Sequence, residues 1–122
     1  LVIPTLWKSE HIHEMLKKYD EHDLVSAIHI IDNAKEFHKH YPNRFPLGKW
    51  RVYQPDVYNE WVVNEAWNIG VRACSDQSLV GILNDDILFD VNGYYELLNQ
   101  MISQQPLENL GYIKKSPHTI FV

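Results

Sequence analysis

Residues 79–89 read Leu-Val-Gly-Ile-Leu-Asn-Asp-Asp-Ile-Leu-Phe, an apolar run that leads directly into an amide and two adjacent carboxylates. This pattern predicts a buried strand that ends at a polar pocket. The adjacent carboxylates of Asp85 and Asp86 are costly unless a cation or solvent compensates them. At the carboxyl end of a central strand, the pair predicts a divalent-metal site. The spacing alone fits a turn or helix cap equally well, because Asn and Asp favour such places.

The rest of the chain alternates apolar runs of strand length with segments whose apolar residues recur at helical spacing. Such alternation requires crossover connections, which predicts a mainly parallel sheet with helices on both faces. We therefore expect a three-layer α/β/α fold in a single domain spanning residues 1–122. Gly70, inside a helical pattern, costs about 1 kcal/mol relative to Ala and predicts close packing of that helix on the sheet. The predicted strands are 1–3, 24–31, 50–53, 79–83, 112–113 and 119–122, and the predicted helices begin near Ser9, Asn59 and Asn92.

Composition and charge argue against several classes of protein. With a net charge of −5 and a pI near 5.7, the chain lacks the basic character typical of general nucleic-acid binding. No apolar run approaches the ~20 residues needed to span a bilayer, and no signal peptide is recognisable. The single cysteine, Cys74, excludes an intrachain disulfide and fits a cytoplasmic location. The chain begins without Met inside a predicted strand, so we expect a fragment or a truncated form of a longer protein.

Polar residues follow three of the predicted strands. They are Pro4-Thr5 after the first strand, Asp32-Asn33 after the second and Asn84-Asp85-Asp86 after the fourth. Ligands of open α/β sheets bind outside the carboxyl ends of the strands, so we expect these groups to converge on one edge. Taken alone, Asp32-Asn33 reads more readily as an Asx turn that closes a strand. Trp7 closely follows Pro4-Thr5 and is predicted to flank a base or a sugar there.

Four short segments carry a resemblance to a known family. They are residues 1–5 (Leu-Val-Ile-Pro-Thr), 30–34 (Ile-Ile-Asp-Asn-Ala), 66–70 (Ala-Trp-Asn-Ile-Gly) and 82–86 (Ile-Leu-Asn-Asp-Asp). In this order and at these distances they resemble the GT-A type of nucleotide-diphospho-sugar transferase fold, and most closely the family-2 glycosyltransferases. The last segment looks like the DxD element of that family, and the resemblance covers nearly the whole chain. It implies a metal-dependent glycosyltransferase with a nucleotide-sugar donor and Mn²⁺ or Mg²⁺ as cofactor.

The resemblance also implies roles for single residues. Asp32 would contact the base of the nucleotide, and Asn84 would face the ribose. Asp86 would be the metal ligand that bridges to the diphosphate, where a cation neutralises the charge that builds up on the leaving group. The predicted donor-binding residues are Pro4, Thr5, Trp7, Asp32, Asn33, Asn68, Asn84 and Asp85, with Asp86 as the metal ligand.

The chain departs from the family pattern in three places. Trp67 stands where many members have Arg, and residues 35–37 (Lys-Glu-Phe) replace the usual Ser-Thr-Asp. An inverting transfer needs a general base that deprotonates the acceptor hydroxyl, and in this family that carboxylate lies further along the chain. Glu96 and Glu108 follow the DxD-like element, but nothing in the sequence places them at the site. The catalytic residues are therefore not assigned.

Three hypotheses remain open from the sequence. The first is the donor-binding part of a glycosyltransferase that acts on an unknown sugar, glycan or other acceptor. The second is a non-catalytic nucleotide- or sugar-binding module that kept the fold and lacks the acceptor half. The third is an unrelated doubly wound fold that binds Mg²⁺ for phosphoryl chemistry. The third predicts acidic residues at the end of the first strand, where this chain has Pro4 and Thr5.

Overall fold

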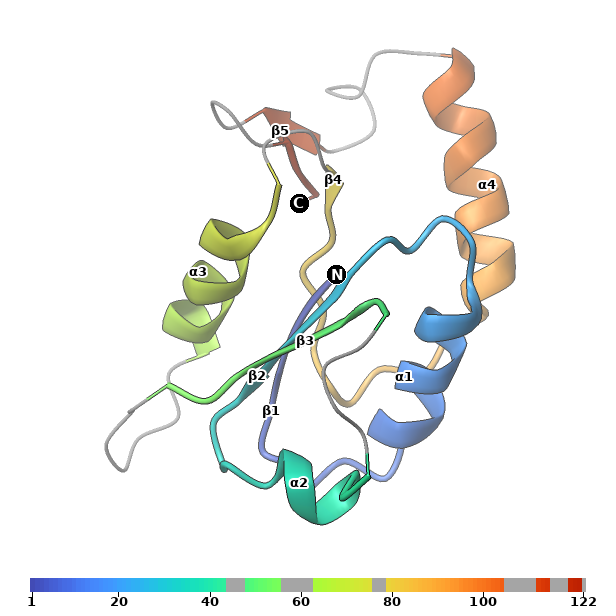
Figure 1. Cartoon of the computed structure of the whole chain (residues 1–122). Helices are drawn as coiled ribbons and strands as arrows, with labels where there is room; N and C mark the ends of the chain where they lie inside the picture. The colour runs from blue at the N-terminus through green and yellow to red at the C-terminus, as the bar shows by residue number, and fades with distance from the viewer. Residues whose placement is uncertain (44–47, 56–62, 76–78, 105–111, 115–118, 122) are drawn as a thin grey trace.

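The computed structural model of the chain describes residues 1–43, 48–55, 63–75, 79–104, 112–114 and 119–121. It is a mixed α/β structure with a parallel three-stranded sheet and, in those residues, four helices (Figure 1). The elements in chain order are β1 (Val2–Thr5), α1 (Ile12–Glu21), β2 (Ile28–Asp32), α2 (Phe37–His40), β3 (Trp50–Tyr53), α3 (Val63–Ala73), β4 (Leu79–Val80), α4 (Val91–Gln104), β5 (Tyr112–Lys114) and β6 (Thr119–Phe121). The predicted α/β class is confirmed at this level. Within the described ranges, no helix combines the length and apolar character needed to cross a membrane.

The parallel sheet has the strand order β1-β2-β3. Its register pairs Ile3 with Ile30 and Thr5 with Asp32, so β1 and β2 end side by side. Every residue of β1 and β2 is buried, as expected for parallel strands that are covered on both faces. A second sheet has the order β4-β6-β5, in which β6 runs parallel to β4 and antiparallel to β5.

The segment that follows β4 lies along the other side of β1. The backbone N–H of Val2 donates to the Gly81 carbonyl over 2.8 Å, and that of Leu83 donates to the Val2 carbonyl over 3.0 Å. A parallel bridge pairs Val2 with Ile82. β1 therefore has β2 on one side and residues 81–83 on the other. Such a reversal of strand order marks the topological switch point of an α/β sheet, outside which ligands bind.

Two apolar clusters lie on opposite faces of this sheet, because neighbouring strand residues point to opposite sides. The first contains Ile3, Ile30 and the buried stripe of α1. That stripe consists of Ile12, Met15, Leu16 and Tyr19, at the spacing that predicted a helix. The second contains Val2, Ile31 and Ala66 of α3. Figure 1 shows α1 and α3 on opposite sides of the strands.

α3 approaches β1 closely at Gly70. A Cβ atom added to this glycine would lie far inside van der Waals contact with the Val2 side chain. Val2 is fully buried and β-branched, so it has little freedom to move away. The close packing predicted from Gly70 is confirmed.

The predicted start of the second strand is wrong. β2 begins at Ile28 and not at residue 24. The N–H of Val25 donates to the His22 carbonyl over 3.1 Å in a turn, and the Leu24 side chain is 54% exposed. The apolar run from 24 to 31 therefore contains a turn as well as a strand, and composition alone does not separate the two.

Two predicted element ends are also corrected. β1 continues through Pro4, which was expected to end it. Pro4 has no N–H to donate, and this position of β1 faces residues 81–83 rather than β2. The hydrogen bonds between β1 and residues 81–83 involve only Val2 of β1, so Pro4 removes none of them. α4 begins at Val91, and the carboxylate of Asp90 accepts the N–H of Gly93 over 3.1 Å. Asp90 thus performs the capping expected of Asn92.

Candidate functional site

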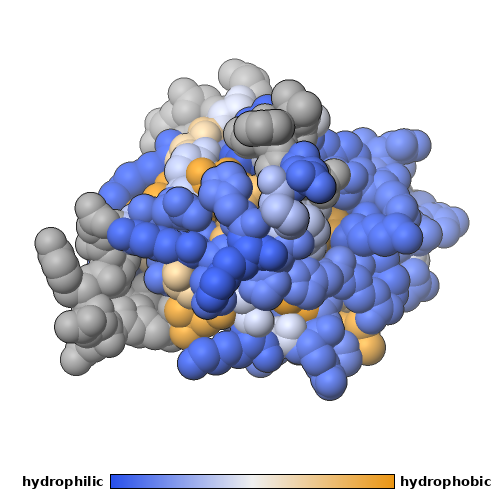
Figure 2. All heavy atoms as spheres, turned by 60° about the horizontal axis from the view of Figure 1, so that its bottom comes forward, coloured by the Kyte–Doolittle hydropathy of each residue, from blue (hydrophilic) through white to orange (hydrophobic). Residues whose placement is uncertain are grey.

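The candidate site lies at the carboxyl edge of the parallel sheet, at the bottom of Figure 1. Figure 2 turns this edge toward the viewer and shows a mostly hydrophilic surface. The N–H of Asn33 donates to the Thr5 carbonyl over 3.2 Å, and the Thr5 hydroxyl donates to Asp85 Oδ2 over 2.8 Å. Residues that follow or end β1, β2 and β4 therefore meet at the switch point. The convergence expected from the sequence is confirmed for these residues.

The acidic turn, residues 84–86, has one inward and two outward side chains. Asp85 is half-buried and accepts the Thr5 hydroxyl. Asn84 and Asp86 are exposed. An exposed carboxylate beside the switch point can bind a cation from solvent without first giving up a buried partner. The structure thus distinguishes two aspartates that their spacing alone presents as equivalent.

Asp32 ends β2 and is fully buried. Its Oδ1 accepts the indole N–H of Trp7 over 2.8 Å and the backbone N–H of Glu36 over 3.1 Å. Its Oδ2 accepts the backbone N–H of Phe37 over 2.8 Å and the side-chain amide of Gln54 over 3.0 Å. Burial by itself would raise the pKa of Asp32, but these hydrogen bonds outweigh burial and lower it. The side chain is therefore a buried anion.

This arrangement gives Asp32 a role different from the predicted contact with a nucleotide base. Each carboxylate oxygen already accepts two hydrogen bonds, which fills its lone pairs. The carboxylate ties the loop after β1 to the start of α2 and the end of β3. The sequence reasoning did not select Gln54. The rule of polar residues at strand ends would have found it, because Gln54 directly follows β3.

Trp7 is also enclosed. Its side chain is 7% exposed, and the rings of His13 and His40 stack on it at centroid separations of 5.8 and 5.0 Å. Phe37 and Tyr41 contact the same indole in tilted arrangements. Burial and the neighbouring His40 lower the pKa of His13. The predicted role of Trp7, flanking a base or a sugar, requires an open ring face, whereas here the indole is buried.

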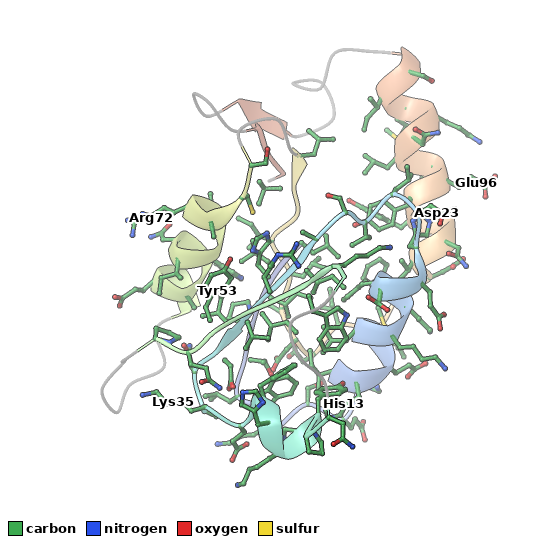
Figure 3. All side chains as sticks on the ribbon, viewed as in Figure 1. His13, Asp23, Lys35, Tyr53, Arg72 and Glu96 are labelled. Carbon is green, nitrogen blue, oxygen red and sulfur yellow. The ribbon has the colours of Figure 1, made fainter. Side chains whose placement is uncertain are left out.

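The loops after β1 and β2 show two further signs of a binding site. Asn33 Oδ1 is the one buried side-chain oxygen or nitrogen without a hydrogen-bond partner in the described part of the chain. A bound ligand or water would satisfy such an atom. Trp7 and Lys35 have left-handed φ angles of 63° and 56°. Strained non-glycine residues concentrate at functional sites, and Figure 3 places Lys35 at this edge.

The remaining candidate residues are not members of this hydrogen-bonded group. Pro4 is buried within β1, and Asn68 is exposed in the middle of α3. Glu96 is exposed on α4, on the opposite side of the view from Lys35 (Figure 3). Glu108 lies outside the described residues. In the part of the chain that the structure describes, no general base is added to those considered from the sequence.

The side chains present fit a divalent cation only together with a ligand. In the ranges that the structure describes, no group of three or more His, Cys, Asp or Glu side chains is arranged to hold a metal ion. Asp86 offers one exposed carboxylate, and Asn84 offers a carboxamide in the same turn. Mg²⁺ and Mn²⁺ need only one or two carboxylates when substrate phosphates supply further oxygens. The donor set therefore fits a metal–diphosphate complex and not a closed protein site.

An apolar cavity of about 540 Å³ lies elsewhere in the molecule. It is bounded by α4, by residues 24–26 and by five residues on either side of the acidic turn: Leu79, Gly81, Leu83, Ile87 and Phe89. None of the side chains that line it is charged. Leu1 and residues 24–26 precede β1 and β2, so the cavity reaches the amino ends of these strands. Leu83 and Ile87, which flank the acidic turn, also line the cavity, but the polar side chains of residues 84–86 do not.

Comparisons with known proteins do not assign a function to this chain. No family model matches the chain, and no curated protein or solved structure shows a significant match. A function is therefore inferred from the geometry at the carboxyl edge of the sheet.

Proposed function

We propose that this chain binds the nucleotide-sugar donor of a metal-dependent glycosyltransferase, in a three-layer fold of GT-A type. The observation that carries the proposal is the exposed carboxylate of Asp86, in a turn that the Thr5 hydroxyl ties to the end of β1. This turn lies at the switch point of the parallel sheet, where α/β proteins bind nucleotides. The face of the molecule at this edge of the sheet is mostly hydrophilic (Figure 2).

Each outward group has a part in this proposal. Asp86 holds the cation, and Asn84 faces the ribose. Asn33 Oδ1, which is buried without a partner, accepts a hydrogen bond from the nucleotide. The bound cation supplies charge neutralisation for the diphosphate as the bond to the sugar breaks. The sugar passes to a hydroxyl of an acceptor, whose proton requires a base that we do not assign to a residue of this chain.

Calorimetric titration tests the donor site directly. UDP-, GDP- and dTDP-sugars are titrated into the protein with and without Mn²⁺. We expect one nucleotide class to bind at least about tenfold more tightly with Mn²⁺, which corresponds to about 1.4 kcal/mol. Asp86→Ala should remove this metal-dependent gain and leave the metal-independent part of the affinity.

The control is Asp23→Ala, because Asp23 is an exposed carboxylate on the far side of the molecule from the edge (Figure 3). This variant should keep the Mn²⁺ effect. Absence of binding for every nucleotide sugar, or an Mn²⁺ effect that survives Asp86→Ala, would contradict the proposal. Binding without transfer to any acceptor would instead favour a non-catalytic module of the same fold.

A further inference from the structure

One continuous chain of hydrogen bonds runs from the buried end of β2 to the acidic turn. The indole N–H of Trp7 donates to Asp32 Oδ1 over 2.8 Å. The backbone N–H of Trp7 donates to Thr5 Oγ1, also over 2.8 Å. The Thr5 hydroxyl donates to Asp85 Oδ2 over 2.8 Å. The chain thus connects the ends of β1 and β2 with the segment that follows β4.

The direction of each hydrogen bond in this chain is fixed by the chemistry of the groups. Both N–H groups of Trp7 can only donate, so Thr5 Oγ1 must accept from the backbone N–H. The hydroxyl then has one proton, and Asp85 Oδ2 is the acceptor that receives it. Thr5 is fully buried, so water does not compete for this proton. Hydrogen bonds to carboxylates are about twice as strong as those between neutral groups.

Trp7 is held in the conformation that this chain needs. Its φ of 63° is left-handed, which a bulky residue keeps only when surrounding contacts enforce it. Those contacts are the hydrogen bond to Asp32 and the stacking of His13 and His40 on the indole. The backbone N–H that fixes the Thr5 hydroxyl is therefore itself fixed.

We propose that Thr5 and Asp85 are positioning residues of the metal–diphosphate site. The Thr5 hydroxyl holds the Asp85 carboxylate inward, and this contact directs the next side chain, Asp86, toward the cation. The inference rests on the proposed function and deepens it, since it assigns the cation to Asp86 alone. Asp85 then needs an oxygen that can accept a hydrogen bond, but its charge is dispensable.

Four variants separate positioning from ligation. Thr5→Val removes the hydroxyl at nearly constant shape, and Thr5→Ser restores it. Asp85→Ala removes the other partner of the same hydrogen bond, and Asp85 is only half-buried. The test therefore still works if the protein does not fold with a substitution at the fully buried Thr5. Asp85→Asn removes the charge but keeps a carbonyl oxygen that accepts the Thr5 hydroxyl.

The first readout is amide hydrogen exchange, without metal or nucleotide, at Leu83, whose N–H donates to the Val2 carbonyl directly before the acidic turn. Thr5→Val and Asp85→Ala should exchange at least about tenfold faster than the parent protein, as expected for loss of one hydrogen bond to a charged acceptor. Thr5→Ser and Asp85→Asn should stay within about threefold of the parent. The second readout is Mn²⁺ affinity in the presence of UDP, measured by calorimetry, which should follow the same order.

The two readouts distinguish failure of the inference from failure of the proposed function. Unchanged exchange in both Thr5→Val and Asp85→Ala would overturn the positioning role, whatever the metal does. If Asp85→Asn loses as much Mn²⁺ affinity as Asp86→Ala, Asp85 is a ligand and the positioning role is again overturned. If the parent protein binds no Mn²⁺ with any nucleotide, the proposed function fails, and with it the assignment of these residues to a metal site.

Discussion

Replacing Gly70 by alanine should destabilise this protein, although alanine is the better helix former by about 1 kcal/mol. The added Cβ would enter the space of the Val2 side chain, and overpacking of a core costs about 1–3 kcal/mol. The cost should lie at the upper end of this range. Val2 is fully buried and β-branched, and its backbone bonds to Gly81 and Leu83. We therefore expect a net loss of about 2 kcal/mol after the gain in helix propensity.

Urea unfolding followed by circular dichroism measures this loss. In a double-mutant cycle, Val2→Ala makes room for the new methyl group, so the combined loss should be smaller than the sum by about 1 kcal/mol or more. The control is Gly93→Ala in α4, where the added Cβ meets only the side chain of the exposed Asp90. That carboxylate can move, and the gain in helix propensity offsets any weakening of its capping bond to the Gly93 N–H, so the variant should stay within about 1 kcal/mol of the parent. A Gly70→Ala protein as stable as Gly93→Ala would refute the close packing of α3 on β1.

Two further predictions concern buried ionisable groups. Burial is the main cause that lowers the pKa of His29 to about 4. As the pH falls, the unfolded chain therefore binds a proton at His29 before the folded protein does. The free energy of unfolding should decrease between about pH 6.5 and about pH 4 by up to about 1.4 kcal/mol per pH unit. In urea titrations at several pH values, His29→Gln should flatten this fall, whereas His38→Gln, at an exposed position, should not. Asp32→Asn should cost about 3 kcal/mol in the same assay, because an amide NH₂ then faces two N–H donors, one of them buried, in either orientation. Asp20→Asn should cost less, since its amide oxygen can still accept an indole N–H; equal losses would contradict the role of Asp32.

The alternation of strands and helices could be predicted because periodicity reports which side of an element is buried. The stripe of α1 and the paired faces of β1 and β2 follow from that signal alone. Boundaries could not be predicted where one local contact decides them. The turn at Val25 depends on a backbone bond to His22, and the start of α4 depends on the Asp90 carboxylate. Neither contact changes the hydrophobic pattern of the chain.

The candidate site was predictable in position but not in partners. Spacing alone presents Asp32, Asp85 and Asp86 alike, as carboxylates that follow strands, and only the family resemblance implied different roles for them. The structure buries the first under four hydrogen bonds, gives the second one partner and leaves the third exposed. These differences come from contacts between distant segments, such as the pairing of Asp85 with Thr5, eighty positions apart. No spacing within residues 79–89 contains this information.

The buried anion explains how the strained loop after β1 is maintained. A left-handed backbone at Trp7 costs about 1–2 kcal/mol for a residue with a Cβ atom. The hydrogen bond from its indole to the Asp32 carboxylate contributes about 1.5–3 kcal/mol, enough to offset that strain. With Trp7 held there, its backbone N–H leaves the Thr5 hydroxyl only one direction for donation, toward Asp85. The buried Asp32 carboxylate therefore determines, through Trp7 and Thr5, how the acidic turn is held. Because Asp85 points inward to Thr5, the next side chain, Asp86, points outward.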